Sequence, residues 1–466
     1  MKLRAMMLSM IGLLLGGSAW GQVKLPPFTT QTLPNGVTLV LCEKKDVPML
    51  ALRVMARGGE EADPRGQAGM GGLMMELMQR GTTSRTAEQF AGELDFLGAA
   101  LRAQTGPQSF SLGVDTLAAH AAKAVELVAD AAVRPAFAEA EFQRALAQRI
   151  DGAKAAKDNP QAAIGRYFAS FFYGASHPYG RVEDELTLKA VTRDGLAAHH
   201  AKLFAGKNLT VIVVGDFASA AMTRMVTEGF GGLAAGAEYA WSGGAALPKR
   251  DSARLLLVDK PDATQTYFSI AQPGITRTHP DRVALEIVNT LFGGRFTSML
   301  NDELRVNTGL TYGARSNVDE ERLTGAIEIS TFTKTETTVE AMDLALTVLR
   351  RLRDKGVDAE MLASAKAYTK GMYPTRALET HGQIAAVLAD LRLFGLNKGE
   401  IDDYFSRIDA LTVERVNQVA RQYYRDENLQ FCLVGAAAKI REKVAKYAPK
   451  MKVMAVTEPG FNVPEF

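Results

Sequence analysis

The segment KNLTVIVVG at residues 207–215 recurs 220 residues later as ENLQFCLVG at residues 427–435. The match continues upstream without a gap, so that the 25 positions ending at Gly215 align with those ending at Gly435. Each copy is typical of a helix, a short polar turn and a buried apolar strand that ends in glycine. A repeat of this length indicates duplication of a whole domain and not a solenoid, whose repeats span about 20 to 50 residues.

The beginnings of the two halves also match. Residues 37–44 and 253–260 are strand-like runs, and an alternating run follows each of them, at 49–55 and 266–270. Amphipathic helical patterns, such as the one over residues 338–355, follow these strands. We therefore expect an α+β fold of two tandem homologous domains, each a mixed, largely antiparallel sheet with helices packed on one face.

The composition places the domain boundaries. Residues 231–248 are rich in Gly and Ala and precede the charged Lys249-Arg250-Asp251, which is typical of a linker. We expect a signal peptide at residues 1–21, an N-terminal domain at 26–235, a linker at 236–252, a C-terminal domain at 253–450 and a tail at 451–466.

The first 21 residues have the features of a secretory signal peptide. A positive start is followed by an apolar run over residues 6–17 and by the small residues Ala19 and Gly21. We expect cleavage between Gly21 and Gln22 and a periplasmic protein, with secretion as the second choice. No later segment has the roughly 18 consecutive apolar residues of a membrane span, so none is expected in the mature chain.

Charge and cysteine content exclude several classes of protein. The chain of 466 residues has 54 Lys and Arg against 52 Asp and Glu, and removal of Lys2 and Arg4 makes it formally neutral. A nucleic-acid partner therefore has no electrostatic support. Two cysteines exclude a disulfide-rich scaffold and a cysteine-built zinc site. Cys42 and Cys432 lie in apolar runs, and we expect them to be buried and unpaired, a disulfide being the alternative.

Common catalytic motifs are missing. The sequence has no P-loop and no G-x-S-x-G nucleophile turn. None of its six histidines has the H-x-x-E-H or H-x-x-x-H spacing that places two imidazoles on one helical face. His199 and His200 are adjacent and would point about 100° apart on a helix. We expect the histidines to be structural or surface residues.

Five short stretches resemble the M16 (pitrilysin-like, inverzincin) peptidase family: ARGGEE at 56–61, GQAG at 66–69, RGTTSRT at 80–86, YGASHPYG at 173–180 and GLTY at 309–312. The duplicated layout agrees with this resemblance, which covers essentially the whole mature chain. In the family, the zinc motif H-x-x-E-H lies between the second and third of these stretches.

The zinc motif itself is replaced. Counting back from Gly81, its five positions are Gly72-Leu73-Met74-Met75-Glu76, so both histidines and the catalytic glutamate are missing. The family's third ligand is a glutamate about 75 residues downstream, where residues 144–153 offer only Asp151. A catalytic zinc needs three protein ligands and a carboxylate that accepts a proton from bound water. We therefore expect no metal on this chain.

The helix expected over these positions carries an apolar stripe at mostly i, i+3, i+4 spacing, formed by Met70, Leu73, Met74, Leu77 and Met78. The simpler interpretation is that the stripe belongs to the core. The alternative is that some of the methionines face the former active cleft as an adaptable contact surface.

In M16 peptidases the second half supplies an arginine and a tyrosine, seven residues apart, that contact the substrate. The resemblance places this pair at Arg305 and Tyr312. An arginine offers a fixed fork of donors, and a tyrosine hydroxyl can stabilise a developing oxyanion. The alternative is a surface salt bridge between Arg305 and Asp302 or Glu303.

Two further segments are candidates for substrate binding. Gly293 and Gly294 suit a flexible loop that lets a peptide approach the backbone, and an ordinary turn between helices is the alternative. Residues 323–332 alternate like a strand and are a candidate sheet edge to which an extended peptide could add.

The resemblance implies a non-catalytic subunit of a periplasmic, heterodimeric M16 zinc endopeptidase. Its partner would carry H-x-x-E-H and the zinc, and the substrate would be an unstructured peptide. The alternative is a catalytically inactive M16 fold that serves as a peptide-binding or assembly scaffold. A third and weaker option is an enzyme that is active alone through substitute ligands.

Overall fold

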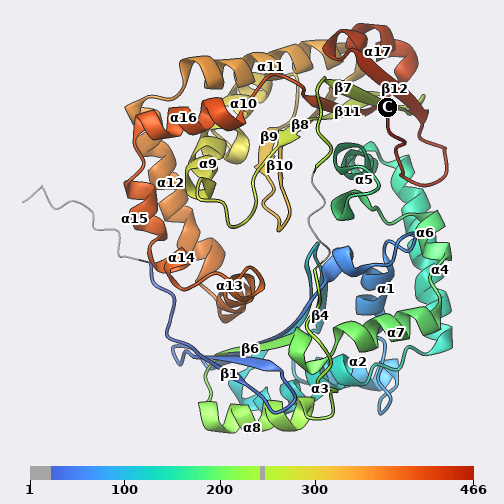
Figure 1. Ribbon diagram of the computed structural model, residues 1–466, viewed down its shortest axis with the longest axis vertical. Helices are drawn as coiled ribbons and strands as arrows, with labels where there is room; N and C mark the ends of the chain where they lie inside the picture. Colours follow the sequence, from blue (N-terminus) through green and yellow to red (C-terminus); the bar gives the residue numbers. More distant parts are fainter. Residues whose placement is uncertain (1–22, 242–246) are drawn as a thin grey trace, which may run out of the picture.

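The structure of this protein is a computed structural model, which describes residues 23–241 and 247–466. The expected signal peptide at 1–21 and residues 242–246 of the expected linker lie outside the described residues. Figure 1 shows two β-sheets at opposite ends of the molecule, with helices on both sides of the space between them. Each sheet has six strands.

The first sheet is built from the N-terminal half. Its strands, in spatial order, are β1 Thr29–Thr32, β2 Thr38–Glu43, β6 Leu209–Gly215, β3 Met49–Arg57, β5 Ser109–Leu117 and β4 Arg102–Thr105. Only the β2–β6 pair is parallel.

The second sheet repeats this order with strands from the C-terminal half: β12 Lys450–Ala455, β7 Arg254–Asp259, β11 Gln430–Gly435, β8 Gln265–Pro273, β10 Ala326–Lys334 and β9 Ala314–Val318. Five strands correspond between the sheets, whereas the sixth differs, because β1 pairs antiparallel with β2 but β12 pairs parallel with β7. The fold class is confirmed, and the segment expected as a tail contributes β12.

The repeated motif forms the same elements in both halves. Thr192 caps α7 (Arg193–Leu203) and Thr412 caps α16 (Val413–Tyr423), each by accepting a hydrogen bond from a backbone N–H of the first turn. The strands that follow, β6 and β11, are buried along their whole length. A continuous apolar run without alternation is typical of a strand covered on both faces.

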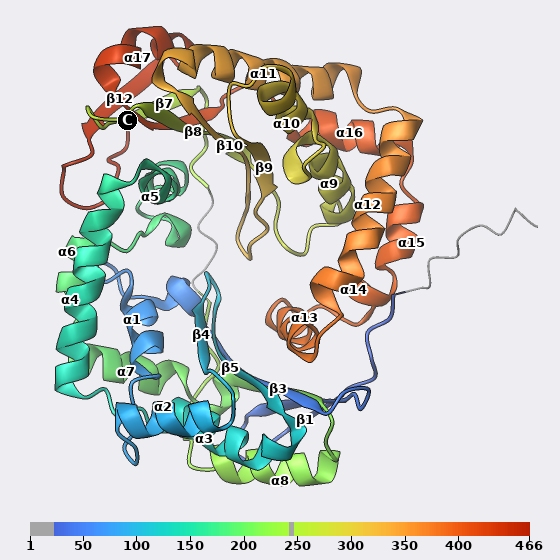
Figure 2. The same cartoon turned by 180° about the vertical axis from the view of Figure 1, so that it is seen from behind.

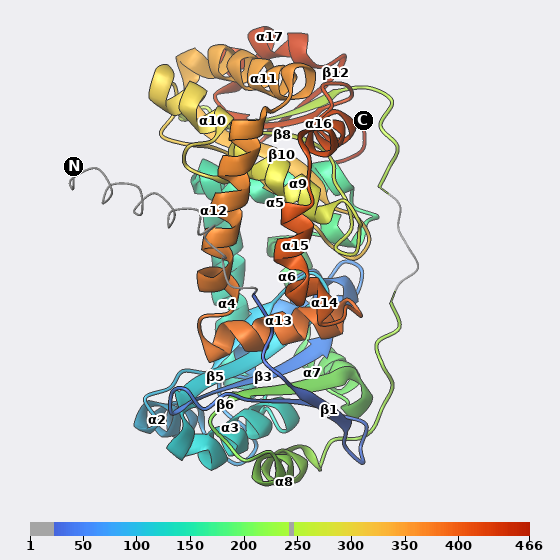
Figure 3. The same ribbon diagram turned by 90° about the vertical axis from the view of Figure 1, so that its left-hand side faces the viewer.

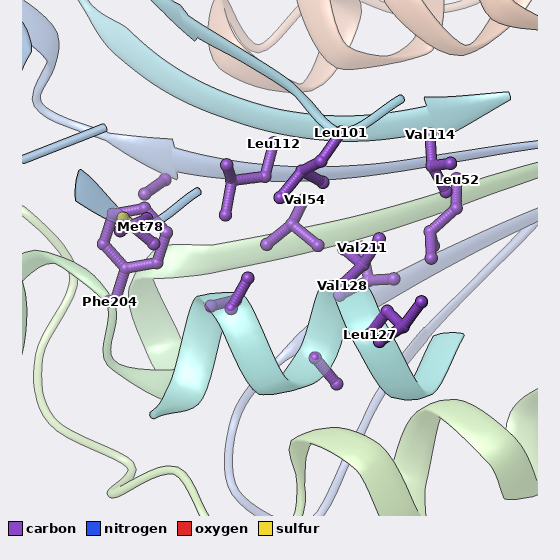
Figure 4. Close-up of a cluster of buried hydrophobic side chains, with 14 of the residues drawn as sticks. Leu52, Val54, Met78, Leu101, Leu112, Val114, Leu127, Val128, Phe204 and Val211 are labelled. Carbon is purple, nitrogen blue, oxygen red and sulfur yellow. The ribbon is translucent and has the colours of Figure 1, made fainter. Parts of the chain in front are cut away.

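One face of each sheet is covered by helices of its own half. In the first half, α3 (Ala121–Val133) and α8 (Ser219–Phe230) pack beneath the sheet, and α1 (Met70–Leu77), α2 (Ala87–Phe96) and α7 extend this layer. Figure 4 shows Leu52, Val54 and Val211 of the sheet facing Leu127 and Val128 of α3. In the second half, the cover comes from α9 (Arg282–Asn289), α11 (Thr338–Lys355), α16 and α17 (Ala437–Val444).

The other face of each sheet is covered by a helix from the opposite half. Helix α13 (His381–Leu393) lies across the first sheet, as Figure 3 shows, and packs Ile384 and Leu388 against Val40, Ile212 and Val214. Helix α5 (Pro160–Tyr173) lies on the second sheet (Figure 2), among residues such as Ala271, Cys432 and Val434. This exchange makes each half part of the other's core.

Five further helices form the two walls that join the sheets in Figure 1: α4 (Glu139–Ala155) and α6 (Glu185–Lys189) in one, α12 (Ala359–Ala377), α14 (Gly399–Asp402) and α15 (Tyr404–Asp409) in the other. No helix in the described ranges is long and apolar enough to cross a membrane. Cys42 and Cys432 are buried and unpaired, as expected.

The prediction of a sheet edge at residues 323–332 is wrong. Strand β10 lies between β8 and β9, and its backbone groups pair with both neighbours. The edges on this side are β9 in the second sheet and β4 in the first. Alternation along β10 reflects a strand with two different faces, which is equally typical of an interior strand.

Candidate functional site

A cavity of about 550 Å³ lies beside α1, and we call it the α1 cavity. It is lined by Gly72, Met75 and Glu76, which the resemblance places where the zinc motif has its two histidines and its glutamate. Arg149 of α4 and Glu183 line it too, as do the edge strand β4 and parts of α5. The tertiary structure therefore brings the two regions that the resemblance singled out, α1 and residues 144–153, to one place.

The guanidinium of Arg149 fills the space next to Gly72. A Cβ atom at Gly72 would lie 2.5 Å from Nη2 of Arg149. Nη1 of Arg149 is 3.4 Å from Oε2 of Glu76, and Nη2 pairs with Glu183. Glu76 also accepts a hydrogen bond of 3.1 Å from Arg80. Glu76, which stands at the position of the motif's second histidine, is thus bound to two arginines.

Helix α1 owes its position to a buried aspartate. Its N-terminal residue follows Gly69, whose φ of 94° is left-handed and which has no side chain to cap the helix. Asp63 caps it instead, because its carboxylate accepts hydrogen bonds of 2.8 Å from the backbone N–H groups of Gly69 and Gly71. A carboxylate at a helix N-terminus is favourable because the macrodipole is positive there.

The apolar stripe of α1 belongs to the core. Met70, Leu73, Met74, Leu77 and Met78 are all buried in the hydrophobic cluster of the first domain. This confirms the simpler of the two interpretations of the stripe.

The α1 cavity is rich in charge. The pKa of Glu60 is raised to about 7, chiefly by burial and also by the nearby carboxylates of Asp63 and Glu183, while Arg149 opposes the rise. By its overall accessible surface Glu60 is an exposed residue, although it is one of the residues that line the cavity. Arg149 is therefore a fixed positive charge among several carboxyl groups.

The loop between β9 and β10 reaches the rim of this cavity from the other domain. Arg322 pairs with the buried Glu61. The backbone N–H of Leu323 donates a hydrogen bond of 3.1 Å to Oη of Tyr179, a cavity residue that also accepts one of 2.7 Å from Gln108. The segment expected as a sheet edge thus makes a contact between the domains.

The second candidate pair is brought together. The Cζ atom of Arg305 lies 4.8 Å from the ring centre of Tyr312 and 4.7 Å from that of Phe296. We call these three residues the aromatic–arginine cluster. Phe296 and Tyr312 are 63% and 77% exposed. The sequence places Phe296 two residues after Gly294, but its exposure and its contact with Arg305 are evident only in the structure.

The expected alternative, a salt bridge between Arg305 and a neighbouring acid, is not formed. Glu303 accepts hydrogen bonds from Arg351 at 2.6 Å and from Asn307 at 3.1 Å, which lower the pKa of its carboxyl. Within the described ranges, Arg305 has no hydrogen bond or ion pair from its guanidinium, and its side-chain contacts are with the two rings.

Gly293 and Gly294 do not form a loop. They end a π-helical turn, Thr290–Gly294, that continues α9. Gly293 is buried, and a Cβ there would lie far inside contact distance of the backbone nitrogen of Ser316 in β9. Gly294 is exposed. The absence of a side chain at 293 therefore permits close packing against a strand.

The comparisons with known proteins agree with this architecture. Residues 39–176 match the profile of the insulinase family, peptidase family M16, and residues 190–368 match the profile of the M16 peptidase inactive domain. The two profiles describe successive parts of one family and together cover more than half of the chain.

The chain belongs to the M16 peptidase family.

Its relatives include an uncharacterized zinc protease of Mycobacterium leprae, which is 26% identical over 403 residues, covering 84% of this chain and 88% of that protein. An uncharacterized zinc protease of Bacillus subtilis is 23% identical over 398 residues, with 85% and 95% covered.

Two solved structures share the fold, each with a TM-score of 0.81 and 88% of this chain covered: an M16 peptidase inactive domain from Pseudomonas fluorescens and a protease from Helicobacter pylori. Their identities are 23% and 21%, and 98% and 100% of those chains are covered.

The zinc named for these M16 relatives does not fit the residues of the α1 cavity. Gly72 and Met75 have no ligand atom suited to zinc, which takes imidazole, thiolate or carboxylate groups. The guanidinium of Arg149 lies against Gly72 and pairs with Glu76. Throughout the described residues, no group of three or more His, Cys, Asp or Glu could hold a metal ion.

The two adjacent histidines of this M16 chain have structural contacts. His200 is buried, its Nε2 lies 3.0 Å from the carbonyl oxygen of Ala132, and burial lowers its pKa to about 4. His199 is also buried, with Nε2 3.6 Å from the helix-capping Asp63.

Proposed function

We propose that this chain is the non-catalytic subunit of a two-chain M16 zinc endopeptidase. It would contribute Arg305, Tyr312 and half of the peptide chamber. A partner M16 chain would carry H-x-x-E-H and the zinc, which supplies the hydrolytic chemistry. The expected signal peptide supports a periplasmic location for the pair.

One observation carries the proposal. In the α1 cavity the guanidinium of Arg149 lies beside Gly72 and pairs with Glu76, whereas in the other domain the half-buried Arg305 lies against the exposed ring of Tyr312. An arginine whose donors are free and a tyrosine hydroxyl beside it are suited to binding a peptide carbonyl or a developing oxyanion.

The test is peptidase activity on an unstructured peptide. The chain is assayed alone and after mixing with an M16 chain that contains H-x-x-E-H and is encoded beside it. We expect activity only in the mixture, and loss of that activity with a chelator. Zinc-dependent activity of this chain alone would overturn the proposal. Inactivity of both the chain and the mixture would instead favour the binding scaffold.

Arg305→Ala separates a shared active site from simple association. Removal of one stabilising donor typically lowers kcat by about 100- to 1000-fold. We expect a loss of this order in the reconstituted pair, with the same complex mass by light scattering. Arg421→Ala, at an exposed arginine of α16, is the matched control and should leave activity unchanged. Full activity of Arg305→Ala would contradict a shared site.

A further inference from the structure

The aromatic–arginine cluster holds a cation by its ring contacts alone. Both rings lie within 5 Å of Cζ of Arg305, and a guanidinium is attracted to a ring face by the ring quadrupole. Ring contacts of this kind leave the N–H donors at the edge of the guanidinium free. No described residue accepts a hydrogen bond from these donors.

The neighbouring arginines are different. Arg351 pairs with Glu303, and Arg295 donates to the carbonyl of Thr297 and to Ser364. Glu303, one of the two acids expected as a partner of Arg305, is thereby occupied. Arg305 is thus a half-buried positive charge beside two exposed rings, and its planar set of donors meets no acceptor among the described residues.

The local backbone is also unusual. Arg305 lies within a π-helical turn, Asp302–Asn307, and Phe296 follows the other π-helical turn by two residues. π-Helical turns are rare and occur frequently at functional sites. The left-handed Gly309, with φ of 64°, reverses the chain after Arg305 and brings Tyr312 back to it. Two hydrogen bonds from β10, from Thr331 to Thr311 and from Thr333 to Leu310, fix the returning segment.

We propose that the aromatic–arginine cluster is a carboxylate-binding subsite, so that the preferred peptides carry an acidic side chain or a free C-terminus where they meet Arg305. The planar fork of a guanidinium matches a carboxylate in a bidentate arrangement, which is stronger than its bond to a neutral carbonyl. Phe296 is the positioning residue, because its ring contacts the guanidinium without using a donor. The aliphatic parts of the peptide would pack on the two exposed rings.

This inference deepens the proposed function and rests on Arg305 facing the substrate. Binding is therefore measured on this chain alone, without the partner, by fluorescence anisotropy. Four labelled versions of one unstructured peptide are used: with an internal Glu or Gln, each with a free or an amidated C-terminus. Charge-assisted hydrogen bonds predict that one carboxylate strengthens binding about tenfold. Comparison of the Glu with the Gln peptides, and of the free with the amidated peptides, identifies whether the side-chain or the C-terminal carboxylate is bound.

Three variants test the assignment. Arg305→Gln should abolish the preference, so that the acidic and neutral peptides bind alike. Phe296→Ala should weaken the preference several-fold, and Phe296→Tyr should retain it, since the ring contact is kept. Arg421→Gln should leave it unchanged. Because the side chain of Phe296 is exposed, its substitution should not unfold the chain, and a thermal melt of each variant checks that it is folded.

Equal binding of the four peptides, no measurable binding, or a preference that survives Arg305→Gln would overturn the carboxylate subsite. None of these outcomes bears on activity with the zinc-bearing chain, which the mixing experiment measures separately. A preference lost in Arg305→Gln but unchanged in Phe296→Ala would remove the positioning role of Phe296.

Discussion

Gly72 and Arg149 are coupled at the scale of single residues. Gly72 lies inside α1, where alanine is normally favoured over glycine by about 1 kcal/mol. At this position, however, a Cβ would lie 2.5 Å from Nη2 of Arg149. The side chain of Arg149 would have to move and would weaken its pairs with Glu76 and Glu183.

A double-mutant cycle tests this coupling. We expect Gly72→Ala to be neutral or destabilising in the native chain, but to stabilise the Arg149→Ala variant by about 0.5–1 kcal/mol. The free energy of unfolding in urea at constant m-value is the measurement. Gly92→Ala is the matched control, because Gly92 lies inside α2 with nothing near its Cβ position and should stabilise both backgrounds equally. Equal effects of Gly72→Ala in both backgrounds would show that Arg149 does not occupy this space.

At the scale of elements, the π-helical turn Thr290–Gly294 packs closely against β9 because Gly293 has no side chain. A Cβ at Gly293 would meet the backbone of Ser316, which cannot move without disturbing β9, whereas at Gly294 the closest atom, the carbonyl oxygen of Asn289, is 3.0 Å away. Overpacking of this kind typically costs about 1–3 kcal/mol.

We therefore expect Gly293→Ala to lower the free energy of unfolding by about 1–3 kcal/mol and Gly294→Ala to have a clearly smaller effect. Chemical denaturation of the two variants, made as a matched pair, measures the difference. If the two glycines formed a flexible loop instead, both substitutions would be tolerated equally well, and that result would contradict the packing described for Gly293.

At the scale of the whole molecule, the exchange of α5 and α13 ties the stability of each domain to the other. Ile384 of α13 is 1% exposed and packs on the first sheet, although it belongs to the second half of the sequence. Without α13, the buried face formed by Val40, Ile212 and Val214 would be open to water. Such a face is costly, because burial of apolar surface is the main term that stabilises a fold.

Ile384→Ala should consequently destabilise the whole chain by about 2–5 kcal/mol while the molecule still unfolds in one transition. Calorimetry gives both quantities. Ala386→Ser, at an exposed position of the same helix, serves as the control. The appearance of two transitions, with only one shifted by the substitution, would mean that the domains unfold independently.

By itself the sequence determined the duplication, the fold class and several elements. The residues of the repeat predict β6, β11 and the helices before them, and the pattern over 338–355 coincides with α11. These elements are readable because apolar periodicity and capping residues act over a few neighbouring residues, and the burial of a strand or helix face leaves its pattern in the sequence. The positions of the replaced zinc motif and of the Arg305–Tyr312 pair follow instead from the resemblance to the M16 family.

Only the tertiary structure decided which distant segments meet. It placed α13 on the sheet of the first half and α5 on the sheet of the second half. It also put β10 in the interior of its sheet and brought Arg149 to Gly72 and Phe296 to Arg305. Periodicity shows that a face is buried but not what covers it, because burial is non-directional and any apolar partner of the right shape satisfies it. Arg149 is not a metal-ligating residue type, so the sequence gives it no role. Its role depends on the fold, which brings its guanidinium to within 3.4 Å of Glu76, 73 residues away along the chain.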